Sequence, residues 1–444
     1  MKRRALFSSF GAALATFPGL CLAQSFGGFL DASAYGLIAN SSSDQSTQLL
    51  SAVQAAVGLG YPLFIPAGRY QISNIDLPSN CKIIGVPGSS IFVSAPYEQI
   101  FFAHQQNRIH LEGLVFDGIA IGEKSEELDA LTFEACSSLG IINCEIRNFS
   151  GNGIHLTTSS GRIENCFVHH VGQTGIWGQN NSNLRITNNQ ISNCHNGGIR
   201  VMRYENEHDG TIVTNNQISG IGSDWGNGQN GNGINIFHAD EVIVANNVIT
   251  DCALSAIRAN STNNTIIRGN QCINSQEVAI FSEFAFSGSI ISNNIVDGAA
   301  TGISITNFDD GGRLAICANN IVRNILPFSP TNPDTTPVGI FAEADTAITG
   351  NLVENVPGVG IGAGWGAFLR NVLVSNNIVR QTKIGIAVSV VAGAGAAKIN
   401  DNMIIGASEA ALAGAEWTQI VTADLAKDNG LYPQISTSEN TIVN

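Results

Sequence analysis

The residue types best suited to chemistry lie in the middle of the chain. We predict catalytic roles for four of them: Glu283, Arg258, His238 and Asp240. Hydrolysis of a glycosidic bond uses two carboxyl groups roughly 5–10 Å apart, and Glu283 could form such a pair with Asp240, or with Asp209 or Asp309. A lyase would instead need a base, together with an Arg or Ca²⁺ that neutralises a uronate carboxylate.

Aromatic and polar residues of the same region are suited to binding sugars. The predicted binding residues are Trp177, Arg200, Asn235, Phe237, Phe281 and Phe341. Aromatic rings stack on sugar rings, and Arg or Asn side chains form hydrogen bonds with hydroxyl groups. Towards the C-terminus the corresponding positions hold Gly, Ala and Ser, so the pattern locates the candidate site in the middle third of the repeat.

Plainer interpretations stay open for both sets of residues. Arg258 and Glu283 would also form an ordinary surface ion pair. The aromatic residues would equally suit the buried underside of a covering loop. Two long insertions, at 203–210 and 220–233, could form either such a cover or the wall of an open groove.

These residues are positioned by a sequence repeat. Asn pairs recur at Asn188-Asn189, Asn215-Asn216, Asn246-Asn247, Asn293-Asn294, Asn319-Asn320 and Asn376-Asn377, with single Asn residues at 270, 351 and 402 and Cys at 144 and 166. The mean spacing is about 26 residues. Each Asn can occupy a left-handed bend and bond to the Asn above and below. Helical repeats are excluded because they lack central Asn pairs, and the Leu framework of a leucine-rich repeat is missing.

A second strand follows each Asn after a variable stretch and begins with Gly-Ile or Ala-Ile, as at Gly198-Ile199 and Gly360-Ile361. Side chains alternate along a strand, so an inward Ile makes the next residue point outward. This rule places the predicted site residues on one outer face. The fold class predicted is an all-β, single-stranded parallel β-helix of about 11–13 coils, closed at its N-terminal end by a capping helix from Gln45 to Val57.

The segment from Asp44 to Tyr70 carries a resemblance to a known superfamily. It contains a helix, a strand and the turn Pro66-Ala67-Gly68-Arg69-Tyr70. In this it resembles the pectate-lyase-like superfamily of right-handed parallel β-helix proteins, and with its Asn-Asn coils the chain resembles a bacterial group of twin-arginine-translocated repeat proteins. The resemblance implies a right-handed helix that binds or cleaves polysaccharide along one sheet. The catalytic signatures of polygalacturonases (Asn-Thr-Asp, Gly-His-Gly, Arg-Ile-Lys) are missing, so it implies no particular reaction.

Residues 1–23 have the features of an export signal. Lys2, Arg3 and Arg4 precede an apolar stretch, and Cys21-Leu22-Ala23 supplies small residues for cleavage near Gln24. The Arg pair favours the twin-arginine pathway, with a general secretory signal or an N-terminal membrane anchor as alternatives. We predict a periplasmic or secreted bacterial protein with no membrane span after signal removal. The expected division is 24–60 for the N-terminal segment and capping helix, 61–415 for the β-helix and 416–444 for a C-terminal cap or tail.

The composition limits the kinds of partner that the protein could bind. A net charge of −14 with only 13% charged residues argues against binding nucleic acid. Most Cys residues are expected to be buried small side chains, and Cys144–Cys166 is the one pair that could form a disulfide. No cofactor or metal is predicted, although Asp309-Asp310 is either a solvated turn or a Ca²⁺ site.

The sequence therefore predicts an exported carbohydrate-active protein, a hydrolase or a lyase, that acts on or binds a polysaccharide along one face. The alternative is a noncatalytic β-helix that binds a cell-envelope glycan or serves as a structural or adhesive rod. Whether the protein is an enzyme, and its oligomeric state, stay open at this stage.

Overall fold

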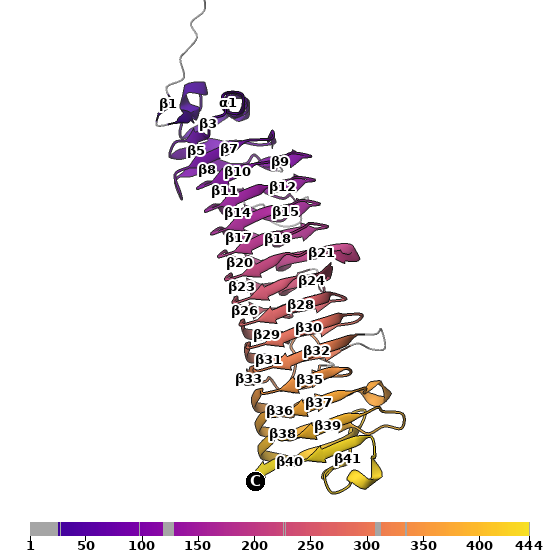
Figure 1. Ribbon diagram of the computed structural model, residues 1–444. Helices are drawn as coiled ribbons and strands as arrows, with labels where there is room; N and C mark the ends of the chain where they lie inside the picture. Colours follow the sequence, from indigo (N-terminus) through magenta and orange to yellow (C-terminus); the bar gives the residue numbers. More distant parts are fainter. Residues whose placement is uncertain are drawn as a thin grey trace, which may run out of the picture.

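The fold is a right-handed parallel β-helix of about 14 turns. A computed structural model describes residues 25–443, except for residues 27, 97, 119–127, 225, 227, 307–311 and 334. The coils stack into an elongated rod, with the helix α1 near one end and the C-terminus at the other (Figure 1). The predicted fold class is confirmed. The number of coils exceeds the estimate because the coils before residue 140 lack the Asn pattern and because the last coil, at Asn440, was not counted. The export signal predicted at residues 1–23 lies outside the described residues.

One sheet, here called sheet A, contains the strands that precede each Asn turn. Its strands are parallel, apart from β1 (Ser25–Phe26), which pairs antiparallel with β2. The strands are β2 (Phe29–Asp31), β4 (Leu63–Ile65), β7 (Lys82–Gly85), β10 (His110–Glu112), β13 (Leu139–Ile142), β16 (Gly161–Glu164), β19 (Arg185–Thr187), β22 (Ile212–Thr214), β25 (Ile243–Ala245), β28 (Asn263–Arg268), β30 (Ser287–Ser292), β32 (Arg313–Ala318), β35 (Thr346–Thr349), β37 (Val372–Ser375), β39 (Ala397–Asn400) and β42 (Ile435–Ser438).

The strands that follow each Asn turn form a second face. They are β3 (Ser41–Asp44), β5 (Gly68–Gln71), β8 (Ser90–Val93), β11 (Val115–Asp117), β14 (Glu145–Phe149), β17 (Phe167–Val171), β20 (Gln190–Cys194), β23 (Gln217–Ile221), β26 (Val248–Cys252), β33 (Ile321–Arg323), β43 (Thr441–Val443), and the first parts of β29 (Gln271–Glu283), β31 (Ile295–Thr306), β36 (Leu352–Ala363), β38 (Ile378–Ser389) and β40 (Met403–Glu416).

The third face, here called the Gly-Ile face, is formed by the strands that begin with Gly-Ile or its equivalent. It consists of β6 (Ile75–Asp76), β9 (Phe101–His104), β12 (Leu131–Glu134), β15 (Ile154–Thr157), β18 (Thr174–Gln179), β21 (Gly197–His208), β24 (Asn232–Asp240), β27 (Ile257–Asn260), β34 (Val338–Ala342) and the last parts of β29, β31, β36, β38 and β40. The Ile of each strand stacks on the Ile of the next coil and is fully buried, as at Ile199, Ile234 and Ile257.

The Gly before each Ile is required by the close approach of successive coils. A Cβ atom added to Gly198 would lie 2.3 Å from the carbonyl oxygen of Gly233 in the next coil. The same contact at Gly360 would be 2.6 Å, to the oxygen of Gly385. Gly is therefore a packing requirement at these positions, and the side chain that follows the Ile is forced outward.

The two Asn residues of each pair have different roles. The first adopts positive φ, for example 58° at Asn188 and 57° at Asn293. The second is buried, and its Oδ1 accepts from the backbone N and Nδ2 of the Asn in the preceding coil at 2.9–3.1 Å, in an unbroken ladder through Asn189, Asn216, Asn247, Asn270, Asn294, Asn320, Asn351, Asn377, Asn402 and Asn440. Buried amides linked in this way have their hydrogen-bonding groups satisfied in a dry interior.

The ends of the rod differ. The helix α1 (Ser46–Leu59) agrees with the expected cap to within two residues at each end, and it buries Leu49, Ala52, Val53 and Ala56. At the other end, β42 and β43 continue the stack beyond residue 415, and β41 (Gln419–Thr422) pairs antiparallel with β40. The short 3₁₀ helices are η1 (Ala32–Tyr35), η2 (Gly366–Phe368) and η3 (Asn429–Leu431).

The cysteines belong to the interior. All eight within the described residues are buried free thiols, as expected for most of them. Cys166 continues the Asn stack, because its backbone N donates to Asn189 Oδ1 at 2.9 Å. Cys194 and Cys252 are separated by the coil of Ile221. Burial raises the pKa of both thiols to about 12, so they behave as small apolar side chains.

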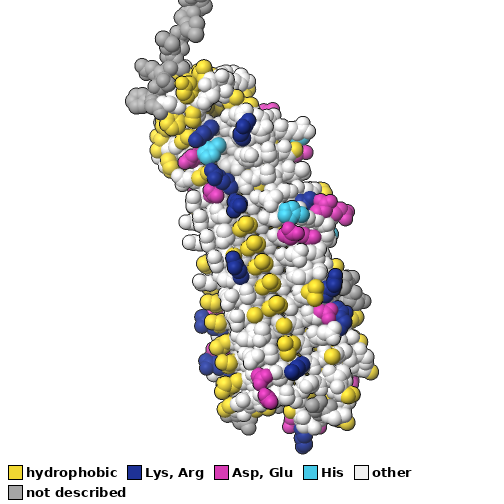
Figure 2. All heavy atoms as spheres, viewed as in Figure 1, with side chains coloured by type: hydrophobic (Ala, Val, Ile, Leu, Met, Phe, Trp, Pro, Cys, Tyr) yellow, Lys and Arg dark blue, Asp and Glu magenta, His cyan; other side chains and the backbone are white. Residues whose placement is uncertain are grey.

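Sheet A carries apolar residues on its outer surface as well. The register aligns Ile212, Ile243, Ile266, Ile290, Ile316, Ala347 and Leu373 in one outward column, in which Ile290 and Ile316 are 40% and 45% exposed. Figure 2 shows a column of hydrophobic side chains along the middle of the visible face. The Gly-Ile face is different, because most outward residues of its middle coils are polar, charged or aromatic.

Candidate functional site

The strand register brings the predicted site residues, apart from His238 and Asp240, into two parallel columns on the Gly-Ile face. The first column, from successive coils, is His155, Trp177, Arg200, Asn235, Arg258, Phe281, Ser304, Phe341, Gly362 and Ala387. The second column, two residues further along each strand, includes Met202, Phe237, Asn260, Glu283 and Thr306. Two hollows lie along these columns, one after the other.

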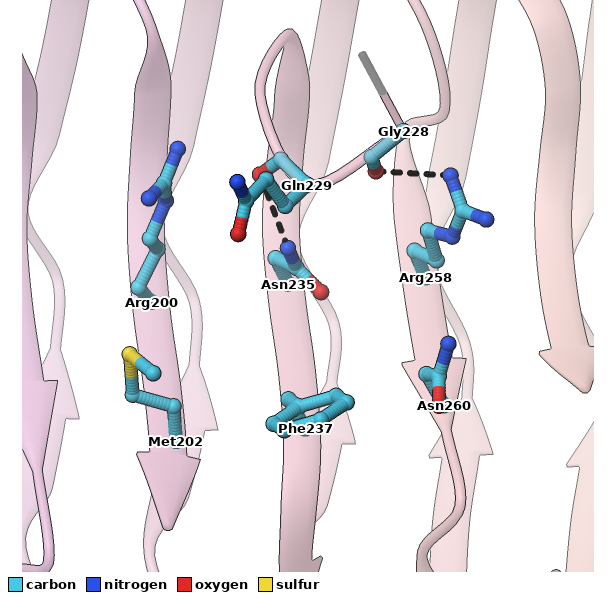
Figure 3. Close-up of a pocket in the computed structure, with 8 residues that line it drawn as sticks. All are labelled: Arg200, Met202, Gly228, Gln229, Asn235, Phe237, Arg258 and Asn260. Atoms are coloured by element: carbon cyan, nitrogen blue, oxygen red, sulfur yellow. Dashed lines mark hydrogen bonds between the residues drawn. The ribbon is translucent and has the colours of Figure 1, made fainter. Parts of the chain in front are cut away.

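The first hollow, here called the upper cavity, has a volume of about 340 Å³ and is lined by Arg200, Met202, Gly228, Gln229, Asn235, Phe237, Arg258 and Asn260. Six of these side chains come from adjacent strands β21, β24 and β27, and the other two residues come from the loop between β23 and β24 (Figure 3). Two Arg residues flank Asn235, while Met202 and Phe237 supply the apolar side. The cavity is therefore a cationic hollow with one apolar edge.

Arg200 is held by neutral groups. Its Nη2 donates to the carbonyl oxygen of Asn196 at 3.2 Å and to Oδ1 of Asn230. Its guanidinium carbon lies 4.8 Å from the ring centre of Trp177. Only 7% of Arg200 is exposed, and burial lowers its pKa to about 10. Trp177 does not line the cavity, so its role in the structure is to support Arg200.

Arg258 is neutralised by carboxylates. Its Nε donates to Oε1 of Glu283 at 2.6 Å, and its Nη1 lies 4.0 Å from Oε2 of Glu277. Glu283 also accepts from Nδ2 of Asn260 at 2.8 Å and is only 2% exposed. The predicted contact between Arg258 and Glu283 is present as a buried pair rather than as a surface one. Glu283 lines neither hollow, so in this geometry it positions Arg258.

The insertion at 220–233 forms one wall of the upper cavity. The Gly228 oxygen accepts from Arg258 Nη1 at 2.6 Å, and the Gln229 oxygen accepts from Asn235 Nδ2 at 2.9 Å (Figure 3). The insertion at 203–210 extends strand β21 instead, and Nη2 of Arg203 donates to Glu207 at 2.6 Å. The two uses expected for these insertions were a cover and a groove wall. The segment 220–233 acts as a wall where it lines the upper cavity.

His238 and Asp240 lie beside the upper cavity but do not line it. The ring of His238 stacks on Phe237 at 3.8 Å between ring centres, and its Nδ1 lies 3.0 Å from the oxygen of Tyr204. Asp240 accepts from the backbone N and Nδ2 of Asn263 at 2.8 and 3.0 Å. These contacts hold a turn between two coils, and the catalytic roles of both residues stay predictions.

The second hollow, here called the lower groove, is larger, at about 560 Å³. It follows the same face over the next coils, and its lining includes Glu277, Phe281, Ser304, Thr306, Asn332, Phe341, Glu343, Gly362, Trp365, Lys383, Ala387, Ser389, Glu409, Ala415, Trp417 and Ile420. Phe281 and Phe341 were predicted from the sequence as binding residues. Arg258 connects the hollows, since its guanidinium carbon lies 5.3 Å from the ring centre of Phe281.

The small residues of the last coils form the floor of the lower groove. A Cβ atom added to Gly362 would lie 2.7 Å from the ring of Phe341, so Gly leaves room for that ring. A Cβ atom added to Gly366 would lie 2.2 Å from the ring of Trp417. The candidate site therefore extends beyond the middle third of the repeat, and the Gly, Ala and Ser residues make space within it.

Sequence reasoning missed the two Trp residues of the lower groove. Trp365 and Trp417 pack edge to face, with ring centres 5.6 Å apart. Trp365 follows the end of β36, and Trp417 lies between β40 and β41 in the segment interpreted as a C-terminal cap or tail. A Trp flanked by Gly364 and Gly366 in a loop next to the site face was the available signal.

Carboxylates reach the lower groove from several coils. Glu277 is 7% exposed, its Oε1 accepts from Asn332 Nδ2 at 3.1 Å, and it lies close to Arg258. Glu343 is 1% exposed and lines the same groove. Glu409 pairs with Lys383 at 3.1 Å on the rim. Unlike the upper cavity, this groove combines aromatic rings with acidic groups.

No group of three His, Cys, Asp or Glu side chains among the described residues is placed to hold a metal ion. The Ca²⁺ alternative at Asp309-Asp310 falls outside the described residues. None of the described helices is long and apolar enough to span a membrane.

Solved structures of other proteins align with most of this chain. The A-module of a mannuronan C-5 epimerase from Azotobacter vinelandii aligns with a TM-score of 0.52 at 14% identity, covering 93% of this chain and 99% of that one. The catalytic unit of a GH87 α-1,3-glucanase from Streptomyces thermodiastaticus aligns with a TM-score of 0.48 at 15% identity, covering 96% of this chain and 70% of that one. No curated protein sequence matches the chain.

A family model described as "Right handed beta helix region" matches residues 129–224 and 204–369, which together make up more than half of the chain. These residues include both hollows except for the last part of the lower groove. From this match and from the coils described above, the chain belongs to the right-handed beta helix family.

Proposed function

We propose that the protein binds a polysaccharide along the Gly-Ile face, with the upper cavity and the lower groove acting as one extended site. The observation that carries this proposal is the succession of the two hollows on one sheet face. The lining residues run from the coil of Arg200 to the coil of Ala415. At roughly 4.8 Å per coil, this face is about 40 Å long, which suits a polymer better than a single small molecule.

The side chains of the site match the surface of a sugar chain. Phe281, Phe341, Trp365 and Trp417 offer ring faces or edges for the apolar faces of sugar rings. Asn235, Asn260 and Asn332 offer amides for hydroxyl groups. The aligned epimerase is named for a polysaccharide, mannuronan. Because one fold hosts many functions, the proposal rests on the hollows and not on that likeness.

The test is binding of the mature chain to immobilised neutral and acidic polysaccharides. Phe341→Ala should weaken retention by about tenfold, which corresponds to about 1.4 kcal/mol for one lost aromatic contact. Phe167→Ala is a matched control, because Phe167 is 38% exposed on a different face. Equal retention of the two variants would remove the Gly-Ile face as the binding surface.

Hydrolysis is the reaction that we propose to test in the lower groove. Glu277 and Glu343 line the same groove, and glycoside hydrolysis uses two carboxyl groups flanking one linkage. Glu283 is less suitable, since it is buried beneath contacts with Arg258 and Asn260. New reducing ends that disappear in both Glu277→Gln and Glu343→Gln would support hydrolysis, and unsaturated products would indicate a lyase instead. Binding without any product favours the noncatalytic glycan-binding alternative.

Export is the remaining part of the proposal. The Arg3-Arg4 pair, the apolar stretch and Cys21-Leu22-Ala23 support cleavage near Gln24 and delivery to the periplasm or beyond. Changing both Arg residues to Lys should retain the precursor in the cytoplasm if the twin-arginine pathway is used. Normal export of that variant would favour the general secretory route.

A further inference from the structure

The charges of the upper cavity do not balance. The cavity is lined by two Arg residues and by no carboxylate. Arg258 has Glu283 at 2.6 Å and Glu277 at 4.0 Å, so two carboxylates of the next coil compensate its charge. Arg200 has no described Asp or Glu partner, because its contacts are with Asn196, Asn230 and the Trp177 ring. One buried positive charge therefore stays uncompensated in a chain whose net charge is −14.

Part of the Arg200 guanidinium is unused. Nη2 makes both hydrogen bonds, while Nε is buried without a partner and Nη1 donates to no described residue. A buried cation without an anion is costly, and burial lowers the pKa of Arg200 to about 10. Since Arg200 is itself buried and Met202 and Phe237 form an apolar edge of the cavity, an anion placed there would interact with Arg200 more strongly than in water.

We infer that the upper cavity is a subsite for an anionic group of the bound saccharide, a carboxylate or a sulfate ester, which Arg200 binds through its Nη1 donors. Arg200 is over 90% buried, lines a cavity of about 340 Å³ and is the cation in it that the protein does not neutralise within the described residues. Asn235 and Asn260 would hold the neighbouring hydroxyl groups. This inference rests on the proposed function for the saccharide, but the anion subsite can be tested without a polymer.

Asn230 provides an internal test of the charge argument. Its Oδ1 already accepts from Arg200 Nη2, so Asn230→Asp places a carboxylate beside the guanidinium with almost no change in shape. This internal anion should occupy the place of an external one. The variant is expected to fold at least as well as the parent, because it neutralises a buried charge that the parent leaves unpaired.

The experiment measures binding of D-glucuronate, D-glucose 6-sulfate, inorganic sulfate and neutral D-glucose to the mature chain, by thermal shift and calorimetry at constant ionic strength. The anions should bind at least tenfold more tightly than D-glucose. Asn230→Asp and Arg200→Gln should each weaken anion binding at least tenfold. Arg185→Gln, which alters an exposed Arg of sheet A, should change nothing. The preferred anion distinguishes a carboxylate ligand from a sulfate ester.

Two outcomes would overturn the inference: no anion binds more tightly than D-glucose, or anion binding survives both Asn230→Asp and Arg200→Gln. Polysaccharide binding that ignores acidic groups and Arg200 would contradict the anion subsite and leave the proposed function standing. Arg200-dependent binding of small anions, without binding of any polysaccharide, would contradict the proposed function and leave the subsite standing.

Discussion

The upper cavity and the lower groove lie on the same sheet face, yet different types of residue form them. The upper cavity is formed where the loop that carries Gly228 and Gln229 turns back over long polar side chains. The lower groove is formed where Gly362 and Ala387 replace long side chains and the Trp residues of two later loops border the space. A uniform repeat thus yields a narrow cationic hollow and a wide aromatic one.

The boundary between the two hollows is the coil of Arg258. Its guanidinium lines the upper cavity, its carboxylate partners Glu277 and Glu283 come from the next coil, and its carbon faces the ring of Phe281. The lining of the upper cavity therefore has Arg residues and no carboxylate, whereas the lining of the lower groove includes Glu277, Glu343 and the Lys383–Glu409 pair. Variants that affect one hollow and spare the other test whether the two are independent subsites.

The largest effect is expected from the ladder that lies beneath both hollows. Asn294→Ala would remove four hydrogen bonds: those that Asn294 Oδ1 accepts from N and Nδ2 of Asn270, and those that its Nδ2 donates to the Ile267 oxygen and to Asn320 Oδ1. At about 1 kcal/mol for each of these buried hydrogen bonds, the free energy of unfolding should fall by about 4 kcal/mol. Urea denaturation measures this loss, and binding in both hollows should suffer together. The exposed Asn355→Ala serves as control, and equal costs for the two variants would contradict the argument.

Glu283→Ala should be the next most harmful change, and it should separate the hollows. It removes the carboxylate that Arg258 and Asn260 contact and leaves a buried guanidinium less compensated. Breaking such a pair costs about 3 kcal/mol. Denaturation measures the cost, and anion binding in the upper cavity should change while the lower groove retains its ligand. Glu283→Gln, which keeps an acceptor, should lose less; if it loses more, charge compensation is not what Glu283 provides.

Trp417→Ala tests the lower groove alone. The variant removes a ring that packs against Trp365 with an interplanar angle of 77°. Retention on polysaccharide should fall about tenfold, a loss of about 1.4 kcal/mol. Binding of small anions in the upper cavity should be unchanged. Weakened anion binding in this variant would show that the two hollows are not independent.

Gly228→Ala is the corresponding change in the upper cavity. Its Cβ atom would lie 2.1 Å from Nη1 of Arg258, so the loop or the guanidinium must shift. We expect a loss of about 1–2 kcal/mol in stability, as for other overpacked sites, with altered anion binding and an intact lower groove. Gly430→Ala is a suitable control, because no atom lies within 4 Å of its added Cβ. Identical melting curves and anion binding for the two variants would argue against this wall.

The smallest effect is expected at the rim of the lower groove. Lys383→Gln breaks the 3.1 Å pair with Glu409, in which both side chains are about half exposed. Such pairs contribute less than about 1 kcal/mol and are screened by salt. Stability should change by less than about 0.5 kcal/mol, as measured by urea denaturation with and without added salt. A larger loss would mean that the rim pair helps to shape the groove.

The sequence predicted the fold and the placement of the site residues well because both depend on periodicity. The alternation after each buried Ile predicted that Arg200, Asn235 and Arg258 would be neighbours on one face, and the register has them so. Contacts made by insertions were not predictable, since no repeat specifies where a loop goes. The wall at Gly228 and the entry of Trp417 into the lower groove both arise in this way.

Roles that depend on burial were also beyond the sequence. Glu283 was predicted as an outward carboxylate. In the structure the surrounding coils bury it, and its charge compensates that of Arg258. The Gly and Ala residues of the last coils were interpreted as lying outside the candidate site. In the structure, the space left by these small side chains forms the lower groove. An outward position in a strand pattern specifies the direction in which a side chain points, but not how exposed that side chain is.

By itself, the sequence determined the parallel β-helix, the inward Ile column and the Asn stack, because each follows from a local preference repeated in every coil. The tertiary structure decided which outward residues share a hollow, which carboxylate neutralises which Arg, and that Arg200 has no Asp or Glu partner among the described residues. Those properties arise between coils and loops that are distant in sequence, where packing and desolvation, rather than local preference, set the energy.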